Sequence, residues 1–319
     1  MSEALEMLEL YPVRIPMRHR FRRVDHRDAV LVHGPSGWGE FSPFPDYPPE
    51  ETTRWLAAAL ELACGELPEP GRSEIPVNVT IPAIAPEIAA ALVRESGADT
   101  AKVKVADPGH TEEDDLERLE AVRDALGSRG KIRVDVNAVW DVDTATRRLQ
   151  RLDEFDLQYA EQPVTTVAEM KELRQRVRVP LAADELVRQS PRPLEVIEEG
   201  AADILILKVQ PMGGVSRVLE LASRSSIPVV ISSALETSIG MYGGLLAASL
   251  LDELPLACGL GTVSMIEGDP TMSPLIPSDG ILQVRRPEPD PSLLERWRPD
   301  RDRGFEMLRR LRAAAELLT

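Results

Sequence analysis

Short apolar runs alternate with longer amphipathic stretches along most of the chain. From residue 75 onward the apolar runs begin at nearly even intervals, at Ile75, Ala101, Lys131, Leu157, Pro180, Asp203, Ile227 and Pro255. Such runs are typical of buried strands, whereas intervening stretches such as 112–126 and 143–155 place apolar residues at helical spacing. Strands that alternate with helices indicate a parallel sheet, and eight strands predict a closed TIM-type (β/α)7β barrel. An open doubly wound sheet is disfavoured, since no Gly-rich phosphate turn follows the first strand.

The two ends of the chain depart from this pattern. Residues 1–74 contain two strand-like runs, a Pro-rich loop and a helix over 51–64, which together indicate a small α+β capping domain. Residues 75–284 would form the barrel. The segment 285–319 follows the barrel and includes a predicted helix from about Asp302 to Leu318. We expect this C-terminal segment to pack with the cap.

Composition excludes several classes of partner. The 319 residues include 37 Lys and Arg against 53 Asp and Glu, a formal charge of -16, which disfavours nucleic acid. The apolar stretch 240–251 is too short to span a bilayer. Cys64 and Cys258 lie far apart, without metal-ligand spacing, and read as buried free thiols. The N-terminus lacks the apolar core of a secretion signal, so we expect a cytoplasmic enzyme for a small-molecule carboxylate substrate.

Charged residues follow the predicted strands at one end. In the run Ala101-Lys102-Val103-Lys104-Val105, both lysines point to the same face of a strand, and the valines point to the other. The next four predicted strands end in Asp135, Glu161, Asp184 and Lys208. Each residue alone has an ordinary explanation, such as a helix cap or a solvated lysine. Because all strands of a parallel barrel end at one mouth, together they indicate a buried charged site.

Three carboxylates on neighbouring strands suggest a metal site. Oxygen ligands without histidine or thiolate favour a hard divalent cation, Mg²⁺ first and Mn²⁺ second. Near such a cation the pKa of a lysine falls, so that a neutral amine can abstract a proton from a carbon acid. The positive charge would stabilise the resulting enediolate.

At this point the motifs resemble a known family, the muconate-lactonising subgroup of the enolase superfamily. The motifs are Lys102-x-Lys104, Asp135-x-Asn137, Glu161-Gln-Pro, Ala-Asp184-Glu, Leu-Lys208 with Gly213-Gly214, and Gly37-Trp-Gly-Glu-Phe-Ser-Pro in the cap. The resemblance implies that Asp135, Glu161 and Asp184 bind Mg²⁺. It also implies that Lys104 and Lys208 face each other across the substrate and that Lys102 supports Lys104.

The absence of certain residue types from the sequence disfavours some of the reactions known in the subgroup. No histidine follows His110, which argues against a histidine base, and Gly259-Leu260-Gly261 stands where dipeptide epimerases carry Asp-x-Asp. The resemblance then implies a dehydratase that eliminates water from a cyclohexadiene carboxylate with a succinyl tail, with Ser232, Gly259 and Asn137 in the substrate pocket. N-succinylamino acid racemisation and muconate cycloisomerisation stay open as alternatives, and a catalytically silent binding barrel is a remote one.

The basic run Arg18 to Arg23 has two interpretations. Its four arginines, in an expected loop over about 16–26, could hold the second carboxylate of such a substrate. Alternatively, they are solvated and only offset the acidic surface.

Overall fold

The computed structural model describes residues 5, 7–21 and 24–318. Its largest sheet has seven parallel strands in the order β11-β10-β9-β8-β7-β6-β5. These strands are β5 (Val79–Ile81), β6 (Thr100–Lys104), β7 (Lys131–Asp135), β8 (Leu157–Glu161), β9 (Leu181–Ala183), β10 (Ile204–Lys208) and β11 (Val229–Ser232). The strand order follows the sequence order, as expected for successive βα units.

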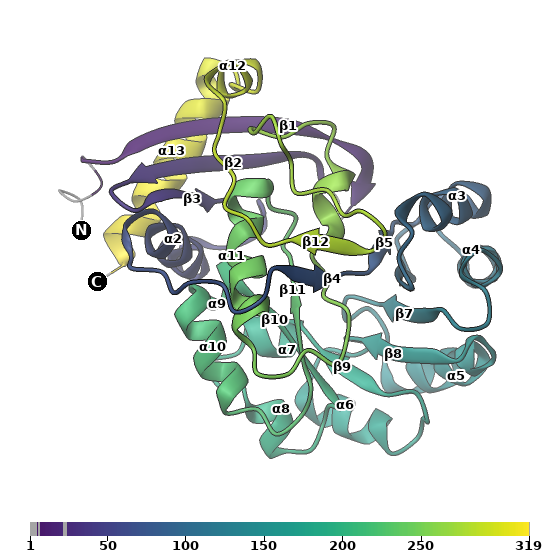
Figure 1. The fold of residues 1–319 in the computed structure, drawn as a ribbon. Helices are drawn as coiled ribbons and strands as arrows, with labels where there is room; N and C mark the ends of the chain where they lie inside the picture. Colours follow the sequence, from purple (N-terminus) through teal and green to yellow (C-terminus); the bar gives the residue numbers. More distant parts are fainter. Residues whose placement is uncertain (1–4, 6, 22–23, 319) are drawn as a thin grey trace.

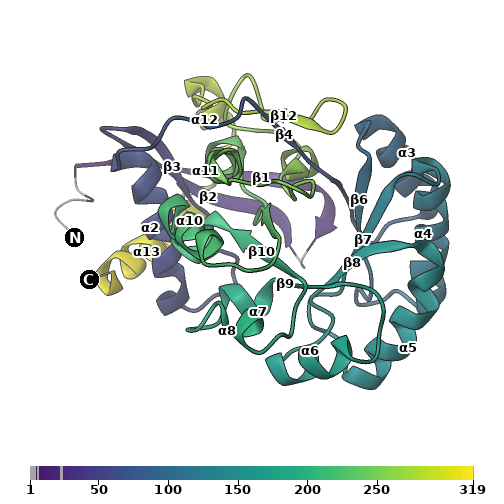
Figure 2. The same ribbon diagram turned by 60° about the horizontal axis from the view of Figure 1, so that its bottom comes forward.

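Helices cover the outer side of this sheet, and α3 to α6 form an arc around the strands in Figure 2. The helical segments of the barrel are α3 (Pro86–Ser96), α4 (Glu112–Leu126), α5 (Val142–Leu152), η1 (Asp153–Phe155), α6 (Val167–Arg174), α7 (Glu185–Arg188), α8 (Glu195–Glu198), α9 (Val209–Met212), α10 (Val215–Ser223), α11 (Ser238–Leu250) and η2 (Gly261–Met265). Thr111 and Thr166 form capping boxes that begin α4 and α6. Local sequence therefore sets where these helices start.

The predicted eighth strand contributes only two paired residues, and these close the barrel. Cys258 forms a parallel bridge with Val77, beside β5, and Gly259 forms one with Ser232 at the end of β11. The backbone N–H of Gly259 donates to the carbonyl of Ile231 at 2.8 Å, and that of Cys258 donates to Pro76 at 2.7 Å. The two edges of the sheet are thereby joined, which confirms the predicted barrel.

The predicted first strand is divided in two. Its start, β4 (Glu74–Pro76), pairs antiparallel with β12 (Ile281–Gln283), and only β5 belongs to the barrel sheet. Pro76 has no N–H to continue a ladder, so the pairing changes partners there.

The cap is a three-stranded antiparallel sheet with helices, drawn in purple, blue and yellow in Figure 1. It contains β1 (Glu9–Phe21), β2 (Val24–Gly34), β3 (Gly37–Phe41) and α2 (Pro49–Cys64), against which the C-terminal α12 (Pro291–Arg296) and α13 (Arg301–Leu317) lie. Ile15, Val30, Trp55 and Leu311 share one buried apolar cluster. The last helix thus packs against the sheet and helix of the first described residues, on the cap side of the molecule (Figure 1).

Carboxylates of the cap bind the N-termini of barrel helices. Glu40 on β3 accepts hydrogen bonds from the hydroxyl of Thr237 at 2.5 Å and from the N–H of Gly240 at 3.0 Å, at the start of α11. Glu61 on α2 accepts hydrogen bonds from Val215 and Ser216 at the start of α10. Negative charge is favourable where a helix begins, so both contacts fasten the cap to the barrel.

Two details qualify the sequence-based picture. Cys258 is buried, as expected, but Cys64 at the end of α2 is exposed, so that expectation was wrong for one thiol. Among the described residues, no helix is both long enough and apolar enough to cross a membrane.

The buried acids at the junction of cap and barrel lead to a prediction about pH. Burial, and then the nearby charge of Glu40, raise the pKa of Glu236 to about 7 from its ordinary value of 4.5. Between pH 4.5 and pH 7 the folded state therefore binds more protons than the unfolded state, and stability falls as pH rises through this window. Glu236→Gln should escape this loss, gaining up to about 3 kcal/mol on wild type between pH 5 and pH 8.

Urea denaturation at several pH values measures this difference. The exposed Glu267→Gln serves as control and should follow the wild-type pH profile. Parallel profiles for wild type and Glu236→Gln would contradict the prediction.

Candidate active site

The charged residues predicted from the sequence lie in register at the carboxyl ends of neighbouring barrel strands. Lys104 pairs with Asp135 between β6 and β7, and Asp135 pairs with Glu161 between β7 and β8. On the other side of the barrel, Lys208 pairs with Ser232, which bridges to Gly259. Parallel pairing thus brings residues far apart in sequence to one mouth.

Lys102 is the central cation on one side of the site. Its ammonium donates to Oδ2 of Asp135 at 3.3 Å and to both carboxylate oxygens of Glu161, at 3.0 and 3.2 Å. All three side chains are buried. Lys102 and Lys104 do point to the interior face of β6, as the alternation with valine predicts, but Lys102 binds carboxylates rather than solvent.

Asp184 is held by two cations on the opposite side. The ammonium of Lys208 lies 2.6 Å from its Oδ2, and Nε of Arg188 lies 3.1 Å from its Oδ1. Arg188 also donates to Glu185, which accepts a hydrogen bond from the side-chain amide of Asn137 at 3.3 Å. Asn137 has a φ of 52°, a left-handed conformation that asparagine tolerates better than most residues. The sharp turn after β7 thereby directs this amide toward the site.

The pKa values distinguish Asp135 from Glu161, and Lys102 from Lys104. Burial acts to raise the pKa of Asp135, but Lys102 and Lys104 outweigh it and lower that pKa to about 2. Burial raises the pKa of Glu161 to about 6, despite Lys102, because Asp135 and Asp184 add negative charge nearby. For Lys102, burial acts to lower the pKa, but Glu161 and Asp135 raise it well above its ordinary value. Lys102 therefore stays an ammonium.

Lys104 behaves differently from Lys102. Its amine donates to two backbone carbonyls, of Val105 at 2.8 Å and of Asp135 at 3.2 Å, and not to a carboxylate. Burial lowers its pKa below the ordinary value. Of these two lysines, Lys104 is therefore the one that gives up its proton more readily.

A small pocket opens at this mouth. It is lined by Phe21, Phe44, Thr80, Lys102, Asp135, Asn137, Lys208, Ser232, Ser233, Ala234, Leu235, Gly259 and Thr262. Six of the nine predicted site residues therefore face one pocket. The other three, Lys104, Glu161 and Asp184, are buried beside it, and the two carboxylates are bound to the lining residues Lys102 and Lys208.

The donor set fits a hard divalent cation. Asp135, Glu161 and Asp184 supply only carboxylate oxygens, from neighbouring strand ends, in a buried place that demands positive charge. In this structure lysines supply that charge, and within residues 5, 7–21 and 24–318 no three His, Cys, Asp or Glu side chains form a metal-binding group. A divalent cation held here would share these carboxylates with Lys102 and Lys208, which now neutralise them.

Several residues around the site are missing from the sequence-based set. Gln162, fully buried after β8, accepts the N–H of Asp184 at 3.0 Å and that of Leu186 at 3.1 Å, and its own amide donates to Val164. It fixes the end of β9, and its place within the Glu161-Gln-Pro motif was the available signal. Phe21 and Phe44 enter the pocket from the cap, and no pattern along the chain marks them.

The structure changes the picture of the basic run. Residues 17–21 belong to β1 and residues 24–26 to β2, with irregular pairing between Pro16 and Phe21, so the expected loop over 16–26 is largely a hairpin. Arg18 donates to the carbonyl of Ser264, and Arg20 is exposed; neither lines the pocket. Arg22 and Arg23 lie outside the described residues.

Comparison with known proteins places this chain in a family. Residues 85–290 match the family described as "Enolase C-terminal domain-like", and residues 13–63 match "Enolase N-terminal domain-like". The chain is 53% identical over 272 residues to the o-succinylbenzoate synthase of Thermobifida fusca, covering 85% of this chain and 86% of that protein. It is 45% identical to the o-succinylbenzoate synthase of Mycobacterium marinum, covering 97% and 94%.

Solved structures share the fold. A muconate lactonizing enzyme from Pseudomonas fluorescens aligns with a TM-score of 0.77 at 20% identity, covering 92% of this chain and 98% of that one. An N-succinyl Arg/Lys racemase from Bacillus cereus aligns with a TM-score of 0.76, also at 20% identity, covering 91% and 97%. At this identity the likeness establishes the architecture alone.

The Lys102 ion pairs give a prediction about stability. Lys102→Met leaves two buried carboxylates without their shared cation, which should lower the free energy of unfolding by about 3–5 kcal/mol in EDTA. Lys102→Met/Glu161→Gln should be more stable than Lys102→Met alone, because one of those charges is gone. Urea denaturation measures both. The exposed Lys131→Met, at the opposite end of β7, is the control. Strict additivity of the two single changes would show that the pair is not coupled.

Proposed function

The chain belongs to the enolase superfamily and, within it, to the o-succinylbenzoate synthases, and we propose that it is a Mg²⁺-dependent dehydratase of this kind. The reaction would be β-elimination of water from 2-succinyl-6-hydroxy-2,4-cyclohexadiene-1-carboxylate in menaquinone biosynthesis, in the cytoplasm. The observation that carries the mechanism is the contrast at the barrel mouth. Lys104 has a lowered pKa and carbonyl partners, whereas Lys208 is paired with a carboxylate 2.6 Å away.

The metal would be held by Asp135, Glu161 and Asp184. When bound, Mg²⁺ would supply positive charge to a substrate carboxylate and so favour loss of the proton on the adjacent carbon. Lys102 and Lys208, which are bound to the same carboxylates, would add positive charge beside the metal.

Lys104 and Lys208 would face each other across the substrate and divide the proton chemistry. Lys104, as a neutral amine, would take the α-proton, and its resulting ammonium would protonate the departing hydroxide on the same face of the ring. Lys208, kept as a cation, would stabilise the negative charge that develops on the carboxylate. Lys102 would hold the Asp135 and Glu161 carboxylates in place beside the base.

The remaining predicted residues would bind the substrate. Ser232, Gly259 and Asn137 line the pocket. A Cβ added at Gly259 would lie 2.4 Å from Oγ of Ser232, so any larger residue would fill the space where a carboxylate of the succinyl tail could reach that hydroxyl. We assign these residues to the succinyl tail and ring rather than to the proton transfers.

A spectrophotometric assay with the cyclohexadiene substrate tests the proposal. Turnover should require Mg²⁺, and EDTA should abolish it reversibly. Glu161→Gln should weaken Mg²⁺ binding and lower turnover by at least about a hundredfold, because the cage loses one charged ligand for an ion that is reluctant to shed water. The exposed Glu154→Gln should behave as wild type. Racemisation of N-succinylamino acids without dehydration would favour the alternative activity, and wild-type-like Glu161→Gln would overturn the metal assignment.

Exchange of the α-proton in D₂O separates the roles of the lysines. Lys104→Arg keeps the charge but cannot act as a base, so exchange and turnover should both fall by about 10²- to 10⁴-fold. Lys208→Arg should also lose turnover, because the planar guanidinium does not fit where the compact ammonium contacts Asp184. Lys131→Arg at the far end of the barrel is the control. Exchange retained by Lys104→Arg would move the base to Lys208.

A further inference from the structure

Two loops from different domains form neighbouring walls of the pocket. The cap loop, residues 42–48 between β3 and α2, contributes Phe44, and the barrel loop, residues 233–237 between β11 and α11, contributes Ala234 and Leu235. None of these residues takes part in the proton chemistry described above. Phe44 therefore bounds the pocket from the cap, and Ala234 and Leu235 bound it from the barrel.

Arg27 on β2 contacts both loops. Its Nε donates to the carbonyl of Leu235 at 2.9 Å and its Nη2 to that of Ala234 at 3.1 Å, while Nη2 also donates to the carbonyl of Ser42. The guanidinium carbon lies 4.4 Å from the centre of the Phe44 ring. The side chain is only 1% exposed. One buried side chain therefore holds the walls from the cap and the barrel at a fixed distance.

The barrel loop needs such a partner. Leu235 has a φ of 63°, a left-handed conformation that leucine seldom adopts. Its carbonyl is the acceptor for Nε of Arg27, and the neighbouring N–H of Ala234 donates to Glu236 at 2.7 Å. These contacts hold a strained backbone at the edge of the pocket, where strain is often maintained for function.

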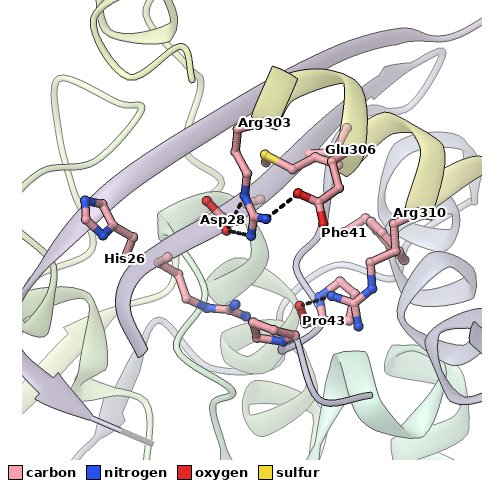
Figure 3. A pocket seen from close by; sticks show the side chains of 12 residues that line it. His26, Asp28, Phe41, Pro43, Arg303, Glu306 and Arg310 are labelled. Carbon is pink, nitrogen blue, oxygen red and sulfur yellow. Dashed lines mark hydrogen bonds and ion pairs between the residues drawn. The ribbon is translucent and has the colours of Figure 1, made fainter. Parts of the chain in front are cut away.

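Arg310 on α13 holds the cap loop from its outer side. It donates to the carbonyls of Pro43 at 3.1 Å, Phe44 at 2.6 Å and Tyr47 at 2.9 Å. Figure 3 shows the side chain of Arg310 beside Pro43. It also shows Arg303, which lies earlier on the same helix, beside Asp28 and Glu306. Arg27, Arg303 and Arg310 all line a second pocket between the cap sheet and α13, and there Arg303 binds Asp28 and Glu306.

We propose that Arg27, supported by Arg310, is a positioning residue that sets the spacing of the Phe44 and Ala234–Leu235 walls and thereby the fit of the substrate ring. This inference rests on the proposed function. An arginine is suited to the task because its planar fork donates to several carbonyls at once and its face stacks on an aromatic ring. A lysine at position 27 would keep the charge but could not make all these contacts.

Steady-state kinetics of Arg27→Lys test the proposal. The KM for the cyclohexadiene substrate should rise about tenfold to a hundredfold, with a much smaller change in kcat, because the loss of charged hydrogen bonds loosens the walls and leaves the lysines and carboxylates in place. Arg303→Lys is the matched control, since it changes the same residue type in the same cavity. It should lower the melting temperature and leave KM within about twofold.

Amide hydrogen exchange gives a second readout that does not need turnover. Exchange in residues 42–48 and 233–237 should accelerate in Arg27→Lys and stay unchanged in Arg303→Lys. If Arg27→Lys does not fold, Arg310→Gln takes its place. It should raise KM and accelerate exchange in residues 42–48 only.

The outcomes distinguish this inference from the proposed function. If wild type fails to dehydrate the substrate, the proposed function is wrong, and exchange in the two loops still decides whether Arg27 positions them. If wild type is active, but Arg27→Lys or its substitute loses only melting temperature, with KM and loop exchange as in wild type, then the arginine is merely structural and the inference is overturned.

Discussion

Charge buried within a low-dielectric interior must be neutralised, and this constraint organises both the mouth of the barrel and its junction with the cap. At the mouth, Lys102 binds Asp135 and Glu161, and Lys208 binds Asp184. At the junction, burial raises the pKa values of Glu40 and Glu236, and the charge of Arg27 acts to lower both. A buried carboxylate without a partner costs several kcal/mol, so removing its partner would destabilise the fold.

Hydrogen bonds to buried polar groups also hold the cap against the barrel. Carboxylates of the cap accept hydrogen bonds from backbone N–H groups in the first turns of α10 and α11. Carbonyls of the barrel loop accept hydrogen bonds from Arg27 of the cap. Helix ends supply partial positive charge in a fixed direction, so these contacts determine orientation as well as affinity. The aromatic side chains that the cap places over the mouth, Phe21 and Phe44, owe their position to that docking.

The sequence predicted the barrel, and with it the meeting of charged strand ends at one mouth, because both follow from local periodicity and parallel topology. The alternation around Lys102 and Lys104 determines which face they occupy, and parallel topology alone brings Asp135, Glu161 and Asp184 to the same end. What could not be predicted depends on contacts between distant segments. Which lysine binds carboxylates and which binds carbonyls follows from side-chain geometry across β6, β7 and β8, and not from spacing.

In the cap too, local sequence predicted one element, whereas others depend on contacts between distant segments. Its helix at 51–64 was predicted within two residues, because an amphipathic pattern marks it. The extension of β1 to Phe21 was not, because an arginine-rich hairpin resembles a solvated turn until its pairing with β2 is known. Arg27 would pass for a surface charge on a cap strand, and only the folded structure shows that it is enclosed by two loops.

The closure of the barrel has a consequence for how the molecule opens. Cys258 and Gly259 join the two edges of the sheet through single bridges with Val77 and Ser232, whereas β6 and β7 share a continuous ladder from Thr100 to Lys104. At this seam few hydrogen bonds have to break for the barrel to part. Cys258 lies on the seam, fully buried, and burial raises its pKa to about 12, while Cys64 is exposed. A thiol reagent would thus modify Cys64 directly, but it would modify Cys258 only when the seam separates. The rate of modification of Cys258 therefore reports how often the barrel opens.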